Sequence, residues 1–164
     1  MLLWPLKIAH KISAFLLFVY IYSYRKWVEW TEREDELVDK IMVLLVMIFG
    51  HIVDDYYLQG ILASMKQKSW WKENAPDKMY EKDYLVALFM HSFSWAFMVM
   101  FMPVILLHFN VATSALLFAF FAANVIVHMI VDDLKANKRK INLWTDQSIH
   151  IIQIVITWIV CYLR

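Results

Sequence analysis

The chain has 164 residues, enough for one domain, and 62% of them are hydrophobic. It contains only two glycines and three prolines, and its mean hydropathy is +0.52. This composition excludes an ordinary soluble globular protein and is typical of a polytopic helical membrane protein. The formal net charge of +1 gives no reason to expect a nucleic-acid partner. The single cysteine, Cys161, excludes an intramolecular disulfide and a cysteine-based metal cluster.

The sequence predicts an all-α fold, a polytopic membrane helix bundle of four core transmembrane helices with an N-terminal fifth. The fifth span is expected within residues 8–24, although its uncharged part is shorter than the roughly 17–25 residues that usually cross a membrane. This segment spans if Lys11 reaches the interface, and otherwise it lies in the interface. Residues 25–40 are expected to form a charged helical connector. Residues 1–40 are therefore one part of the chain, and residues 41–164 are the four-helix transmembrane domain.

Four core spans follow the charged connector. They are expected at residues 40–65, 84–107, 111–131 and 146–163. The connector 66–83 is rich in lysine and contains a helix breaker at Asn74-Ala75-Pro76, whereas 108–110 is a very short turn. The connector 132–145 is basic. Within the spans, Pro103 is expected to kink or weaken the end of its helix.

Lysine and arginine predict the orientation of these spans. Eleven of them fall in connectors 66–83 and 132–145 and near the N-terminus, and five fall on the other side. Positively charged connectors face the cytoplasm. We therefore expect an inner (cytoplasmic) membrane protein with its N-terminus and both basic connectors on the cytoplasmic side.

Three histidine–aspartate pairs lie at the cytoplasmic ends of the core spans. They are His51 with Asp55, His128 with Asp132, and Asp146 with His150. Residues four apart share a helix face, and in each pair the aspartate is expected nearer the surface with the histidine one turn deeper. His91 lies about two turns into its span from the same side. Ionisable residues inside a membrane are costly and usually functional, so this convergence predicts a site.

The charge of this group predicts a bound cation. Buried carboxylates persist when they are paired or bound to a metal, and Asp54, three residues after His51, is a further candidate ligand. Imidazole and carboxylate without thiolate favour one or two divalent transition-metal ions, zinc first, with manganese and iron as alternatives. A proton relay or a structural polar network remains the rival interpretation. His10 and His108 are expected to lie at the interfaces, outside this group.

The same residues resemble a family of small bacterial and phage integral membrane proteins known as a domain of unknown function. The resemblance rests on the strings HxxxD-aromatic-xLQ (51–59), HxxxDxxK (128–135) and DQxxH (146–150), together with His91. It covers roughly residues 41–163 and implies a polar site without an established reaction. Asp54 departs from the family pattern, where a small residue is usual, and its role as a ligand stays open. A looser resemblance connects the chain to bacterial membrane-bound metal-dependent hydrolases.

These observations favour an integral membrane metal-binding protein, with a metal-dependent hydrolase as the first hypothesis. Its substrate would be a lipid or lipid-linked molecule at the cytoplasmic leaflet. The four histidines would be metal ligands, and the aspartates would be ligands or would orient the imidazole rings. Gln59 and Lys135 would stabilise an oxyanion or bind a phosphate head group.

Two alternatives remain. The first is a proton or divalent-ion transport protein, and the second is a non-catalytic membrane interaction protein stapled by metal. Transport requires a polar path to the far side, and the spans offer few polar residues beyond the cluster: Thr113, Ser114 and Thr157. Membrane lipid is the expected partner, and self-association into a homo-oligomer remains open.

Overall fold

The computed structural model describes residues 19–20, 22–23, 36–107 and 114–162, and within these residues it contains helices and turns but no strand. The expected all-α class is confirmed. Four long helices form the bundle: α2 (Glu36–Val53), α5 (Asp83–Leu107), α6 (Ser114–Ala136) and α7 (Leu143–Cys161). Four short helices join α2 to α5: the π-helix η1 (Asp54–Leu58), α3 (Leu62–Met65), α4 (Lys68–Asn74) and the 3₁₀ helix η2 (Lys78–Tyr80).

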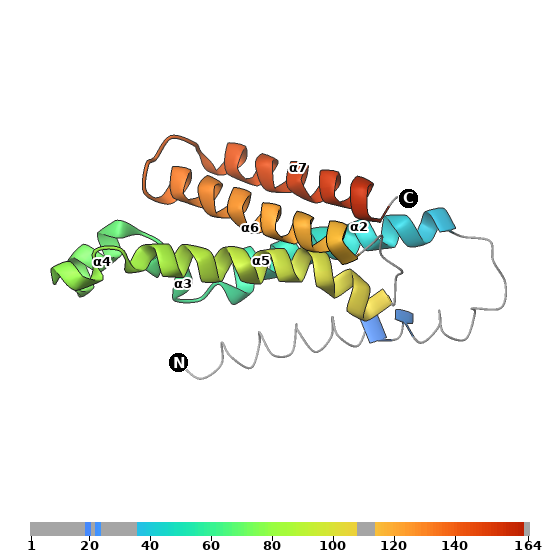
Figure 1. Ribbon diagram of the computed structural model, residues 1–164, viewed down its shortest axis with the longest axis horizontal. Helices are drawn as coiled ribbons and strands as arrows, with labels where there is room; N and C mark the ends of the chain where they lie inside the picture. The colour runs from blue at the N-terminus through green and yellow to red at the C-terminus, as the bar shows by residue number, and fades with distance from the viewer. Residues whose placement is uncertain (1–18, 21, 24–35, 108–113, 163–164) are drawn as a thin grey trace.

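The long helices run side by side along the longest axis of the molecule (Figure 1). α5 packs against both α2 and α6, and α7 contacts α6 and α2. The apolar core lies between these helices. Its fully buried members include Val43, Met47, Trp95, Val99 and Ile154.

Three stretches of the described residues are long and apolar enough to cross a membrane. They are Val38–Leu58, Lys78–Ile105 and Ala115–Ala136. The outward faces of these helices carry large exposed apolar side chains, among them Leu45, Phe89, Phe97, Phe118 and Ile126. Such a large apolar exterior suits lipid rather than water. The structure therefore supports residence in a membrane.

The segment predicted as the fourth core span forms the helix α7, which is not among these three stretches. Its inner face carries polar residues, including Asp146, His150 and Gln153, and its outer face exposes isoleucines, including Ile152 and Ile156. That α7 crosses the membrane stays a prediction. Of the expected N-terminal span only residues 19–20 and 22–23 are described, and they are helical. The turn 108–110, His10 and His108 lie outside the described residues.

The expected helix 40–65 is wrong in one respect, because it is not continuous. The α-helix gives way to η1 at Asp54, helical structure ends at Leu58, and the short helix α3 follows. Gly60 permits this break, since its φ of 51° is readily adopted by glycine and costly for other residues.

The other connectors differ from expectation mainly at their ends. α6 continues to Ala136, so Asp132 and Lys135 belong to a helix rather than to the basic connector. The break predicted at residues 74–76 is present, since α4 ends at Asn74. α5 passes through Pro103, and Figure 1 shows this helix bending near its carboxyl end. Proline causes such bends because it removes a backbone donor and crowds the preceding turn.

Candidate metal centre

Polar side chains from all four long helices meet at one end of the bundle, next to the connectors that join α2 to α5 and α6 to α7 (the connector end). The structure brings together all eight predicted ligands: His51, Asp54, Asp55, His91, His128, Asp132, Asp146 and His150. The four histidines are each 2% exposed or less. Asp133, by contrast, turns away and pairs with Lys138 at 2.9 Å.

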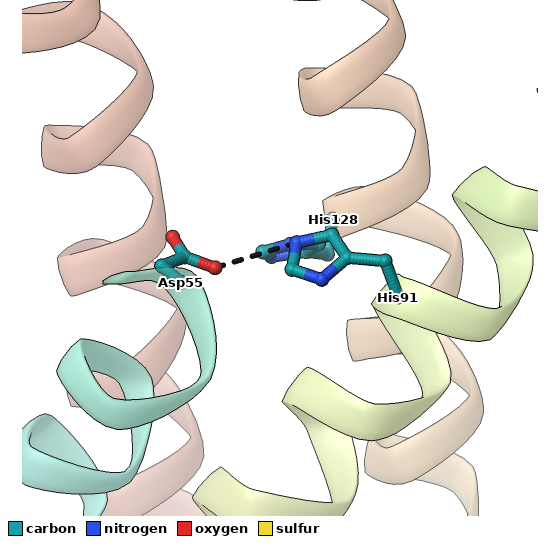
Figure 2. A group of neighbouring side chains, drawn as sticks. All are labelled: Asp55, His91 and His128. Atoms are coloured by element: carbon teal, nitrogen blue, oxygen red, sulfur yellow. Dashed lines mark hydrogen bonds and ion pairs between the residues drawn. The ribbon is translucent and has the colours of Figure 1, made fainter. Parts of the chain in front are cut away.

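Two overlapping groups have the spacing of metal ligands. One contains Asp55, His91 and His128, and the other contains His128, Asp132 and His150; the donor atoms of each group lie within 4.8 Å of one another. Figure 2 shows the first group, in which Asp55 points across the bundle towards His91 and His128. Nε2 of His91 lies 3.1 Å from Nε2 of His128 and 3.4 Å from Oδ1 of Asp55. It also lies 3.4 Å from Oδ2 of Asp132.

These spacings fit a shared cation. With bonds of about 2.0–2.1 Å, two ligands of a tetrahedral zinc ion lie about 3.3 Å apart, longer than most hydrogen bonds. Five buried atoms of the cluster also have no hydrogen-bond partner within the described part of the chain: Oδ2 of Asp54, Oδ1 of Asp55, Nδ1 of His128, Oδ1 of Asp146 and Nε2 of His150. Buried polar atoms are normally paired. A cation is the partner that carboxylate oxygens and imidazole lone pairs have in common.

Asp54 lies behind His91 rather than among the converging donors. Its Oδ2 is 3.4 Å from Nδ1 of His91, and its Oδ1 accepts a hydrogen bond of 2.6 Å from the Ser94 hydroxyl. The wider turn of η1 begins at Asp54 and carries both adjacent aspartates, so that each reaches a different nitrogen of His91. A carboxylate behind a histidine favours the ring proton on the near nitrogen. Nε2 of His91 then faces the cluster, where it accepts a hydrogen bond of 3.0 Å from the Gln59 amide that a bound metal would replace.

The Gln153 amide holds the His150 ring through its Nδ1 atom. Nε2 of Gln153 faces Oδ1 of Asn124 at 3.2 Å, which turns the Gln153 amide oxygen towards Nδ1 of His150 at 3.2 Å. Asn124 in turn donates to the Thr157 hydroxyl at 2.8 Å. Nδ1 of His150 therefore acts as the donor, and its Nε2 faces Asp132 and Asp146, each 3.6 Å away.

His51 differs because both of its ring nitrogens are engaged. The Trp95 indole donates to Nδ1 at 2.8 Å, and Nε2 lies 3.1 Å from Oε1 of Gln147. An indole N–H is only a donor, so Nδ1 accepts and Nε2 carries the ring proton. With both nitrogens engaged, His51 is better suited to positioning Trp95 and Gln147 than to binding a metal. Trp95 also stacks on His128, with ring centroids 4.4 Å apart.

A cavity of about 350 Å³ opens beside the cluster. It is lined by Asp55, Tyr56, Gln59, Ala63, Lys66, Gln67, Asp132, Lys135, Ala136, Leu143 and Gln147. Both residues predicted to assist the reaction, Gln59 and Lys135, are among them. The Gln59 amide donates to Nε2 of His91 at 3.0 Å. Lys66 donates to Oδ2 of Asp132 at 2.6 Å, and Lys135 to Oδ2 of Asp146 at 2.5 Å.

Sequence reasoning missed several residues of the site. Lys66 was assigned only to a connector, and Trp95 to no role. Asn124 and Gln153 add polar groups beyond the cluster, so the expectation that only Thr113, Ser114 and Thr157 lie there was incomplete. A signal was present, because Asn124 precedes His128 by four residues and Gln153 follows His150 by three, which places them on the same helix faces.

No family model, curated protein or solved structure matches this chain. The structure itself defines a class: a helical protein with helices apolar enough to cross a membrane and buried histidine–aspartate groups that could hold a metal ion. These features are compatible with a membrane metal-binding protein.

Proposed function

We propose that the chain is an integral membrane metal-dependent hydrolase that acts on a lipid or lipid-linked substrate. One observation carries this proposal: buried carboxylate and imidazole atoms without hydrogen-bond partners in the described residues converge beside a cavity. A purely structural metal has its coordination closed by protein, whereas a catalytic one keeps a position open to water or substrate. The motif resemblance to membrane-bound metal-dependent hydrolases points in the same direction.

The metal would be held by the members of the two groups: Asp55, His91, His128, Asp132 and His150. Nitrogen and oxygen donors without sulfur suit zinc best, with manganese and iron as alternatives, and the two groups accommodate one or two ions. When bound, such an ion lowers the pKa of water and polarises a carbonyl or phosphoryl oxygen.

The protein's own residues would orient the reactants. Asp54 and Gln153 hold the rings of His91 and His150 with their lone pairs directed at the cluster. The Gln59 amide, which lies in the cavity wall, has N–H groups that can donate to a substrate oxygen. Lys135, in the same wall, brings a positive charge to that region.

A lipid substrate is supported by the rim of the cavity. Tyr56 and Leu143 line it and are 58% and 53% exposed. Trp144, next in the chain, is 84% exposed, as expected of a side chain at a membrane interface. The cavity therefore joins a polar floor to an apolar rim. The basic connectors lie at this end, which favours the cytoplasmic leaflet under the positive-inside rule.

Proton or ion transport is the second candidate. The chain of hydrogen bonds from His150 through Gln153 and Asn124 to Thr157 supports it, because it carries polar contacts away from the cluster along α6 and α7. A relay predicts that purified protein in liposomes dissipates an imposed pH gradient and that Asn124→Leu stops this. A hydrolase predicts no such flux.

Hydrolysis is tested with detergent-purified protein loaded with zinc or manganese. Mixed micelles would present lipids that differ in the bond to be cleaved: a carboxyl ester, a phosphomonoester and a phosphodiester. We expect cleavage of one class, its loss on chelation and in His128→Ala, and its retention in Asp133→Asn, which lies outside the cluster. Metal-loaded, folded protein that cleaves none of the three would refute the hydrolase proposal.

A further inference from the structure

Two lysines contact the cluster from the side of the cavity. Asp132 directs Oδ1 at His150 and Oδ2 at Lys66, and Asp146 directs Oδ1 at His150 and Oδ2 at Lys135. Each carboxylate therefore lies between a histidine and an ammonium group. Both lysines line the cavity, Lys66 from the turn after α3 and Lys135 from the last turn of α6. A group that enters the cavity meets these two ammonium ions beside the candidate metal ligands.

The charges of the site allow an anion at this position once metal is bound. Four carboxylates, those of Asp54, Asp55, Asp132 and Asp146, contribute four negative charges when ionised. With a single divalent cation, two of these negative charges would stay uncompensated, and they would repel an anion. Lys66 and Lys135 neutralise the remaining two, and a second divalent ion would leave a surplus of two positive charges. The lysines thus convert an acidic cluster into one that accepts an anionic group.

The shape and lining of the cavity favour an amphiphile. Its volume of about 350 Å³ lies at the low end of the range for small-molecule sites, so it holds a compact head group rather than a whole lipid. The Gln59 and Gln67 amides each make one hydrogen bond within the protein and have a second N–H group beside the two lysines. The exposed apolar side chains of Tyr56 and Leu143 lie where a chain attached to such a head group would leave the cavity.

We infer that this cavity binds the phosphate group of a lipid phosphate ester, with Lys66 and Lys135 as its anion-binding side chains. The inference rests on the proposed hydrolase function and names the class of its substrate. Ammonium groups bind phosphate through strong charge-assisted hydrogen bonds. In hydrolysis, water adds across the P–O bond: phosphorus gains the hydroxyl group, the bond to the alkoxy oxygen breaks, and the proton goes to the leaving alcohol.

The test is a binding measurement that does not depend on turnover. Zinc-loaded protein in detergent would be titrated by calorimetry with dodecyl phosphate, with dodecanol as the uncharged amphiphile, and with inorganic phosphate as the head group alone. We expect dodecyl phosphate to bind at least about tenfold more tightly than either control, since it alone offers both the anion and the chain. Lys66→Gln and Lys135→Gln should each weaken it about tenfold, whereas Lys66→Arg should restore part of the loss. Lys138→Gln, which removes an equivalent charge outside the cavity, should change nothing.

Each other result has a defined meaning. Equal binding of dodecyl phosphate and dodecanol, or unchanged binding in both glutamine variants, overturns the phosphate inference. Inorganic phosphate that binds as tightly as dodecyl phosphate overturns its lipid part. Phosphate binding without cleavage of any lipid leaves the inference standing and refutes the hydrolase. Cleavage of a carboxyl-ester lipid without phosphate binding leaves the hydrolase proposal standing and refutes the phosphate inference.

Discussion

Single residues decide whether the histidines of this site can bind a metal. A neutral imidazole has one nitrogen that donates and one that accepts, and the partner on one side selects which nitrogen remains available. Asp54 faces Nδ1 of His91, and Gln153 accepts from Nδ1 of His150, so Nε2 of each ring is directed at the cluster. At His51 the Trp95 indole donates to Nδ1, so the ring proton lies on Nε2 instead. Four histidines at one depth therefore have different roles.

The role of Gln153 can be tested by its replacement with leucine. Gln153→Leu keeps the volume but removes the acceptor that holds the Nδ1 proton of His150, so the ring can rotate or change tautomer. Loss of such a partner typically costs about 10- to 100-fold in metal affinity. Competition with a fluorescent zinc chelator measures this, with circular dichroism to confirm an unchanged helix content. Asn74→Leu, which removes an amide at an exposed position outside the cavity, is the control; equal affinities in the two variants would exclude a positioning role for Gln153.

The sequence predicted much of the site at this scale. The i, i+4 spacing of the three pairs placed six side chains in one cluster, because helix periodicity fixes the face on which a residue lies. His91 was added from its depth in its span, and Asp54 from its position three residues after His51. Contacts made across helices were not predictable from that spacing. The pairing of Lys66 with Asp132 and the contact of Trp95 with His51 depend on how α2, α5 and α6 pack.

At the scale of elements, the close approach of α2 and α5 positions the site. Gly50 precedes His51, and a Cβ atom at this position would lie 2.9 Å from the backbone oxygen of Met98 on α5. Small residues permit such contact between membrane helices. Because backbone rather than a flexible side chain blocks the added methyl, the helices must separate if it is introduced. His51 and His91 lie on these two helices and would move apart with them.

Gly50→Ala should therefore destabilise the protein by about 1–3 kcal/mol, as overpacking of a tight interface does. A lower thermal unfolding midpoint in detergent, together with weaker zinc binding, is the expected outcome. Ala123→Val adds bulk on the exposed face of α6 and should leave both quantities close to wild type. If Gly50→Ala unfolds at the wild-type temperature, the contact between α2 and α5 is not as close as described.

Helix positions were predicted better than helix ends. The apolar runs located α2, α5, α6 and α7, because each run is long enough to form a helix with an apolar face. The π-helical turn η1 was not predicted, since a change from i→i+4 to i→i+5 hydrogen bonds leaves no mark in hydropathy. α6 also runs beyond its apolar stretch, because Leu134, Lys135 and Ala136 are good helix formers that do not end it.

Across the whole molecule, an apolar exterior surrounds an apolar core that holds one buried polar cluster. Buried histidine, aspartate and amide side chains fill the connector end of the interior, and isoleucine and phenylalanine cover much of the exterior. Charged side chains persist in a membrane interior where they pair or bind cations. The bundle therefore serves as an apolar support for one polar site near a membrane surface.

This arrangement predicts which side of the membrane the site occupies. In a Cys161→Ala background, Lys72→Cys and Lys138→Cys introduce thiols at exposed positions of the two basic connectors. Both should react with a membrane-impermeant maleimide in inverted vesicles and remain unmodified in intact cells, because the positive-inside rule places both connectors in the cytoplasm. Labelling of either one from outside the cell would contradict the proposed orientation, and labelling of the two from opposite sides would contradict the shared face of the connectors.

The metal content of the purified protein shows whether metal occupies the histidine–aspartate cluster. Inductively coupled plasma mass spectrometry of wild-type protein should find about one or two transition-metal ions per chain, zinc first. His128→Ala should lose them, because His128 belongs to both candidate groups, and Asp133→Asn should retain them. Folded wild-type protein that was purified without a chelator and carries no transition metal would contradict metal binding at this cluster.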